Sequence, residues 1–112
     1  IKRMALALNV FQTIPYVAPT VAVGIYTAPV GYTGVVLLAQ AANVGTVTRT
    51  VSLSHKRDAV TTEIVKGLPV QASDTANLLP GKLVLETGDV LMLSANDASD
   101  IKFLGSVLET LN

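Results

Sequence analysis

Apolar and polar residues alternate with a period of two along much of this chain, whereas the periodicity of an amphipathic helix is nearly absent. Short runs of Val, Ile, Leu and Thr recur roughly every ten residues, bounded by Gly, Pro, Asn and Asp. This pattern is typical of strands that each bury one face. We therefore expect an all-β fold, a single antiparallel β-sandwich of about eight strands with jelly-roll or related Greek-key topology.

The first two strands are predicted near the N-terminus. Residues 1–11 carry apolar side chains at alternate positions, which share one face of a strand and are expected in the core or at subunit contacts: Met4, Leu6, Leu8 and Val10. The apolar run is too short and too regular for a signal peptide, so no targeting signal is predicted. An arm that docks on a neighbouring subunit is the alternative for residues 1–11. The second strand is indicated by Val21, Val23 and Ile25.

The two following strands differ in how many of their faces are apolar. Residues 34–44 are apolar or small at both parities, including Val36 and Leu38, as in a central strand that is covered on both sides. A neighbouring subunit is a candidate for the second cover. Residues 46–55 instead place Thr and Ser on one face and apolar side chains on the other, namely Val47, Val51 and Leu53. They predict a strand with one solvated face.

The second half of the chain predicts further strands at residues 60–67, 82–86, 89–95 and 101–111. Residues 55–59 are polar and predict a turn. Residues 71–81 change from polar to apolar, which favours a crossover between two sheets. Thr87–Gly88 predicts a hairpin between the strands on either side, because Gly88 adopts a positive φ without steric cost.

The chain is short of charged residues. Of its 112 residues, 14% are charged, whereas an ordinary soluble domain has about 25%. A single domain of residues 1–112 has too little interior to hide the uncharged surface that results, so part of that surface is expected to be buried by association. The formal net charge is zero, so neither nucleic acid nor an anionic membrane is expected as a partner.

The nearly uncharged stretch 4–48 is interrupted by prolines and glycines, so no membrane span is predicted. The chain also has no cysteine, which excludes disulfides and thiolate metal sites. Two basic pairs, at 2–3 and 56–57, are too few for a nucleic-acid site.

His55 is the only histidine and the first candidate for chemistry. As a general base it would need Ser54 or Asp58, but neighbours on a strand point to opposite faces, and no nucleophile elbow is present. We interpret His55 as a surface residue beside a polar turn.

Two pairs of acids are candidates for Ca²⁺, Glu86 with Asp89 and Asp97 with Asp100. Each pair supplies two carboxylates, where a dedicated site commonly has three or more oxygen-rich side chains. Turn-forming Asp is the ordinary interpretation. We therefore expect no catalytic, cofactor-binding or metal-binding residue, and no cofactor.

Aromatic residues are too few to predict a sugar-binding platform, since the chain has no Trp. Its tyrosines, Tyr16, Tyr26 and Tyr32, all lie in the first third and are interpreted as packing residues at strand ends with solvated hydroxyls.

Two stretches, "IYTAPVGYTGVVLLAQAANV" at 25–44 and "LLPGKLVLETGDVLMLSAN" at 78–96, are followed by "GSVLE" at 105–109. In this order, with a Thr-rich strand between them, they resemble small β-sandwich virion proteins of tailed bacteriophages. The resemblance covers about residues 25–110 and consists of strand and turn patterns without a catalytic signature.

The resemblance implies a non-enzymatic virion subunit, most specifically a capsid decoration or cement protein. It implies a homo-oligomer, with a trimer favoured, whose partners are other virion proteins such as the major capsid or tail proteins. Its location is then the virion, assembled in the host cytoplasm. A neck, tail, baseplate or fibre-attachment subunit is the alternative position on the particle.

Two other classes of function remain open at this point. A receptor- or glycan-binding module at a fibre tip would use the loops 27–33, 55–59 and 96–100. A small hydrolase or isomerase with a site between subunits would depend on His55 and Asp58.

Overall fold

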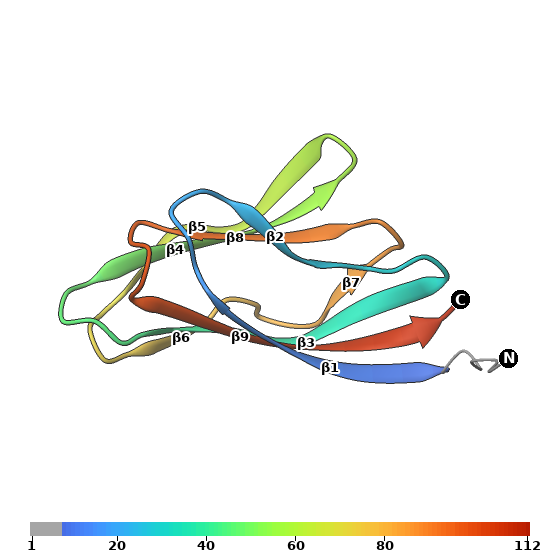
Figure 1. Cartoon of the computed structure of the whole chain (residues 1–112), viewed down its shortest axis with the longest axis horizontal. Coiled ribbons are helices and arrows are strands. Elements are labelled where there is room, and N and C mark those ends of the chain that lie inside the picture. Colours follow the sequence, from blue (N-terminus) through green and yellow to red (C-terminus); the bar gives the residue numbers. More distant parts are fainter. Residues whose placement is uncertain (1–7) are drawn as a thin grey trace, which may run out of the picture.

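The structure is a computed structural model that describes residues 8–112. These residues form two antiparallel sheets that face each other, and they contain no helix (Figure 1). Sheet A has the order β1-β9-β3-β6, with β7 also paired to β3, and sheet B has the order β2-β8-β4-β5. The strand bounds are β1 Asn9–Val17, β2 Val23–Thr27, β3 Tyr32–Asn43, β4 Arg49–Arg57, β5 Val60–Val70, β6 Thr75–Asn77, β7 Leu83–Leu85, β8 Val90–Ala95 and β9 Ile101–Leu111.

The topology is that of a jelly roll, as predicted. Four antiparallel pairings build one long ribbon that folds back on itself: β4 with β5, β3 with β6 and β7, β2 with β8, and β1 with β9. Rolling this ribbon adds two further pairings, β9 with β3 and β8 with β4. If β6 and β7 are taken as one interrupted strand, eight strands remain. The interruption holds Leu78 and Leu79, which turn into the core.

The predicted hairpin at Thr87–Gly88 is wrong, although the turn itself is present. Gly88 has a φ of 89°, but β7 belongs to sheet A and β8 to sheet B, so the turn carries the chain across the sandwich. Within the described residues, β4 and β5 are the one pair of consecutive strands that lie side by side. The crossover predicted at 71–81 is confirmed in its first part, since residues 71–74 lead from β5 in sheet B to β6 in sheet A.

The N-terminal strands begin later than alternation predicted. β1 starts at Asn9 and β2 at Val23, and both Leu8 and Val21 are exposed. Val10 is half-buried. Met4 and Leu6 lie outside the described residues, so the predicted strand or arm at 1–11 stays a prediction over that part.

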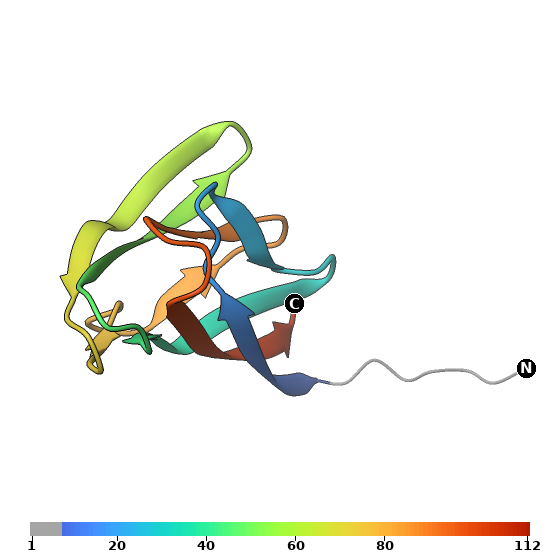
Figure 2. The same ribbon diagram turned by 60° about the vertical axis from the view of Figure 1, so that its left-hand side comes forward.

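The strand predicted at 46–55 is displaced in the same direction. Val51 and Leu53 are buried as expected, but Val47 precedes β4 and is exposed. The polar residues predicted as a turn at 55–59 mostly extend the strand, and the turn itself consists of residues 58–59. The resulting β4–β5 hairpin is long and extends away from the sandwich (Figure 2).

The core lies between the inner faces of the two sheets, and one aromatic ring sets its shape in sheet A. Phe103 is buried, and a Cβ on Gly105 would lie 2.9 Å from its ring. Ala39 and Ala41 on the neighbouring β3 are buried as well. The small residues of "LAQAAN" are therefore explained by the space that Phe103 occupies.

A β-bulge in β3 decides which residues of the most apolar strand reach the core. Val36 pairs with Val107 and Leu38 with Ser106, so Leu37 is an extra residue. The bulge reverses the alternation. Val36 therefore points inward while Leu38, two residues later, lies on the outer face with Val35.

We expect Val36→Asp to abolish folding, because Val36 is 0% exposed and a carboxylate there would be buried without a partner. The cost should exceed about 4 kcal/mol, a large part of the stability of a small domain. Thermal and urea unfolding followed by circular dichroism would measure it. Val35→Asp is the matched control on the outer face, and it should keep a cooperative transition. Similar stabilities for the two variants would contradict the assignment of the two faces.

Candidate assembly surface

The outer face of sheet A carries an apolar row that crosses the whole sheet. Phe11 pairs directly with Leu108, Leu108 with Val35, and Val35 with Val84, so all four side chains lie on one face in one line. Phe11 is 74% exposed and Val84 is 54% exposed, while the two central residues are half-buried. We call these four residues the apolar row.

Other apolar residues extend the row along the same face. Leu104 lies opposite Pro15, and Leu38 is brought to this face by the bulge. Lys102 is the one charged residue on this face within the described strands of sheet A. The shortage of charge in the sequence is therefore concentrated on one surface.

The outer face of sheet B is different in character. Strand β4 presents Thr50, Ser52, Ser54 and Lys56 there, and Glu63 of β5 lies opposite Ser54. The predicted solvated face of this strand is thus confirmed. Met92 and Val90 of β8 lie opposite Ser54 and Lys56, so the outer face of sheet B is mixed, whereas that of sheet A carries the continuous apolar row.

The sequence predicted part of the apolar surface of sheet A. It identified β3 as apolar on both faces, and the structure buries the inner face only. It did not single out Leu104 and Leu108 of β9, although the signal was present, because apolar residues occur at both parities in residues 101–111. Phe11 and Val84 were missed because their place in the row depends on the pairing between strands.

Asp89 is the centre of the polar contacts at one end of the sandwich. Its buried carboxylate accepts hydrogen bonds from both Nε and an Nη of Arg57, at 2.8 and 2.7 Å, and it contacts His55 Nε2 at 2.9 Å. The backbone N–H of Glu86 donates a further bond of 2.9 Å. The Arg57 guanidinium holds the pKa of this carboxyl well below its usual range, against the opposing effect of burial.

His55 is therefore committed to Asp89, and the hydrolase-like pairings considered for it do not form. Ser54 lies on the opposite face of β4, as strand geometry predicted. Asp58 follows in the turn with a φ of 53° and lines a cavity of about 330 Å³ together with His55, Arg57, Val60 and Thr62. The cavity lies beside the β4–β5 hairpin, and the His55 in its wall contacts the carboxylate of Asp89 and not a nucleophile.

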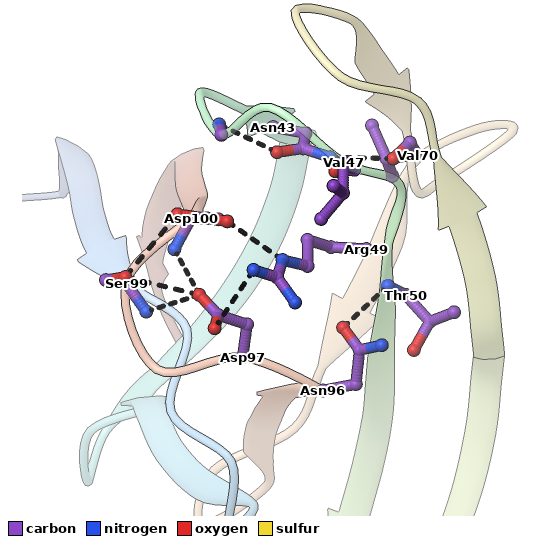
Figure 3. Close-up of polar contacts among 10 residues, drawn as sticks. Asn43, Val47, Arg49, Thr50, Val70, Asn96, Asp97, Ser99 and Asp100 are labelled. Atoms are coloured by element: carbon purple, nitrogen blue, oxygen red, sulfur yellow. Dashed lines mark hydrogen bonds and ion pairs between the residues drawn. The ribbon is translucent and has the colours of Figure 1, made fainter.

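At the opposite end Arg49 lies between the other two acids (Figure 3). Its Nε donates to Asp100 at 2.8 Å, and its Nη2 lies 3.4 Å from Asp97. Asp97 also accepts bonds from the backbone N–H groups of Ser99 and Asp100, which lower its pKa with Ser99 contributing most. The turn-forming interpretation of Asp97 is confirmed.

Both acid pairs considered for Ca²⁺ thus face an arginine, since Glu86 also approaches Arg57 at 3.4 Å. Within residues 8–112 no group of three or more His, Cys, Asp or Glu side chains is placed to hold a metal. In the same part of the chain no helix is long and apolar enough to cross a membrane.

Asn43 connects the loop between β3 and β4 to the end of β5, beside Arg49. Its buried side-chain amide donates to the carbonyl groups of Val47 and Val70 and accepts from the N–H of Gly45, each at 2.8 or 2.9 Å (Figure 3). A Cβ at Gly45 would collide with the carboxylate of Asp100. An Asn before a turn is common in sequences, so its burial was not visible without the fold.

The tyrosines do not gather into a platform. Tyr26 is buried, and its hydroxyl donates to Glu109, so the prediction of a solvated hydroxyl is wrong for this residue. Burial is the larger cause that raises the pKa of Tyr26, and the hydrogen bond to Glu109 raises it further. Tyr16 is exposed on β1, and Tyr32 is half-buried at the start of β3.

The loops considered for receptor binding lie at two different ends. Gly88 bonds to Ala28, and Asp89 reaches Arg57, so loops 27–33 and 55–59 share one end. Loop 96–100 lies at the other, where Val44 bonds to Asp100. A single binding site cannot use all three loops.

We expect Asp89→Asn to destabilise the fold by about 2 kcal/mol at pH 7, because it replaces charge-assisted hydrogen bonds with weaker ones. The pKa of Asp89 is lower in the folded protein. The contribution of Asp89 to the free energy of unfolding is therefore complete at pH values above the pKa of the unfolded state, about 3.9. It decreases as the pH falls from there toward the pKa of Asp89 in the folded protein. Urea unfolding between pH 2 and 8 would show the two proteins converging below about pH 4.

Asp58→Asn is the control for this experiment, since it removes an acid from the adjacent turn where Asn also tolerates a positive φ. It should change stability by less than about 0.5 kcal/mol. A constant difference between wild type and Asp89→Asn across this pH range would show that Asp89 is not held ionised by its neighbours.

No family model and no curated protein matches the sequence. Solved structures do resemble the fold. A chain of the acid-stable capsid of Helicobacter pylori bacteriophage KHP30 superposes with a TM-score of 0.57 and 14% identity, over 94% of this chain and 89% of that one. A chain of the Bacillus endospore appendages, described as disulfide-linked pili, gives a TM-score of 0.50 and 17% identity over the whole of both chains. At these identities the likeness shows the fold alone: this chain is similar in fold to a subunit of a phage capsid and to a subunit of a pilus.

Proposed function

We propose that this chain is a non-enzymatic structural subunit of a tailed-phage virion, most specifically a capsid decoration or cement protein. The observation that carries the proposal is the outer face of sheet A, where the apolar row crosses the sheet and Lys102 is the one charge within the described strands. The sequence resemblance to virion proteins and the likeness in fold to a capsid chain support the same function.

A decoration protein stabilises a shell by burying apolar area against several shell subunits at once. Each Å² of apolar surface removed from water contributes about 25 cal/mol. The row therefore supplies a driving force without requiring charged pairs. Several copies held on one shell add their contacts, so that the separation of shell subunits is opposed by all of them together.

The polar clusters are better suited to holding the fold than to catalysis. Asp89 and the Asp97–Asp100 pair are each satisfied by an arginine, and these contacts connect turns at the two ends of the sandwich. A subunit bound to a shell has to keep its strands in place while its apolar face is in contact with the shell proteins. We accordingly propose no catalytic residue and no cofactor.

The proposed partners are further copies of this chain and other virion proteins, with the major capsid protein first and tail proteins second. The trimer implied by the sequence resemblance stays a prediction. The proposed location is the virion, after assembly in the host cytoplasm. A neck, tail, baseplate or fibre-attachment position would use the same apolar face on a different partner.

The proposal is tested by co-sedimentation of the purified chain with empty capsids and, separately, with tails. We expect saturable binding to capsids, reduced at least about tenfold by Val35→Asp, because a carboxylate in the row would have to be desolvated. Ser94→Asp is the matched control on the outer face of sheet B, opposite Ser52, and should bind as the wild type does.

Binding to tails and not to capsids would support the alternative position, in the neck, tail, baseplate or fibre attachment. Binding that is lost with Ser94→Asp and kept with Val35→Asp would show that the wrong face was chosen. A folded chain that binds neither particle would overturn the virion proposal.

A further inference from the structure

We infer that two copies of this chain pair edge to edge through the N-terminal half of β1, antiparallel and with Phe11 opposite Phe11 of the second copy. The inference rests on the proposed function and deepens it, because it names the first partner and the register of its contact. Three features of β1 carry it: an unpaired edge, the direction of its backbone groups, and the position of Phe11 at the end of the apolar row.

β1 is an edge strand with one side unpaired in the described structure. It pairs with β9 along Asn9 to Val17 without a register shift, and no other described strand pairs with it. Most of its side chains are exposed on both faces. Figure 2 shows β1 at the margin of the sandwich.

The direction of the free backbone groups follows from the two ends of the pairing. Leu8 accepts a bond from Leu111 through its carbonyl, and Ala18 donates through its N–H to Ile101. Because antiparallel strands alternate which residues face the partner, the even residues of β1 face β9. The odd residues between them therefore direct their N–H and C=O groups to the open edge.

Pro15 limits how much of this edge can accept another strand. It is an odd residue without an N–H, so it places a gap among the outward donors. Asn9, Phe11 and Thr13 keep their donors and acceptors. The edge is thus blocked at its C-terminal half and open over residues 9–13.

A second copy of the same segment fits this open part. With Phe11 opposite Phe11, Asn9 lies opposite Thr13 in both directions, and each of these pairs joins outward-facing residues. Each such pair can exchange two N–H···O=C bonds, as hydrogen-bonded pairs do in antiparallel sheets. A shift by one residue would instead oppose outward-facing residues to inward-facing ones and lose these bonds.

The same register continues the apolar row across the junction. Residues directly opposite in an antiparallel pair lie on the same face, so the two Phe11 rings would meet on the outer face of sheet A. The row would then run without interruption from Val84 of one copy to Val84 of the other. The outer face of sheet A in one copy and that of sheet A in the other would then form one continuous surface toward the shell.

The paired segment is short, so the contact area is small and association should depend on concentration. Sedimentation equilibrium over a concentration series is expected to show monomer and dimer. Thr13→Pro removes one outward N–H from each copy and should weaken dimerisation at least about tenfold, because the partner carbonyls lose their donors. Val17→Pro makes the same change on the same edge beyond Pro15, and it should leave the dimerisation constant within about twofold.

A cross-link reports the register directly, because this chain has no cysteine of its own. Phe11→Cys would bring two thiols within disulfide range across the junction. We expect a disulfide-linked dimer to form on mild oxidation. Val84→Cys is the control, exposed on the same face at the far end of the row, and it should cross-link much more slowly.

A monomer at all concentrations, a trimer that is insensitive to Thr13→Pro, or equal cross-linking at positions 11 and 84 would overturn this inference. Capsid binding separates it from the proposed function. A monomer that binds capsids through Val35 would contradict the inferred dimer and leave the proposed function standing. A dimer with this register that binds neither capsids nor tails would contradict the proposed function and leave the inferred dimer standing.

Discussion

The antiparallel pairing of β9 with β3 is the contact on which the rest of the structure depends, because it closes the rolled ribbon and sets both faces of sheet A. β9 also pairs with β1, so a single strand aligns the N-terminal edge with the centre of the sheet. The bulge at Leu37 lies in this pairing. It directs Val36 to the core and Leu38 outward, and every residue of β3 beyond it follows the shifted alternation.

The two ends of the sandwich are held by arginine–carboxylate contacts that replace the apolar packing available at its middle. At one end Arg57 and His55 reach across to Asp89, and at the other Arg49 holds Asp97 and Asp100. In each case an arginine or histidine of β4 meets an acid in a turn next to β8. The strand with the most polar outer face therefore also supplies the arginine and histidine side chains that hold the turns in place.

Sheet A carries large apolar side chains on both faces, and the sandwich covers only one of these faces. This is the physical link between a composition poor in charge and the proposed structural role. An outer face made of Phe11, Val35 and Leu108 is costly to leave in water, and burial against other subunits removes that cost. The open half of the β1 edge lies beside the same face, so both features direct association to one side of the molecule.

The sequence by itself determined the all-β class, the two-sheet architecture, the crossover at 71–81, the position of Gly88 in a turn and the apolar character of both faces of β3. These depend on local periodicity and turn chemistry, which are read within a few residues. Only the tertiary structure decided that the Thr87–Gly88 turn crosses between sheets, and that Phe11, Leu108, Val35 and Val84 form one row. It also decided that Asp89 is buried against Arg57 and His55, far from it in sequence. Pairing between distant strands and the bulge at Leu37 set these relations, and alternation along one strand carries no information about which strand lies beside it.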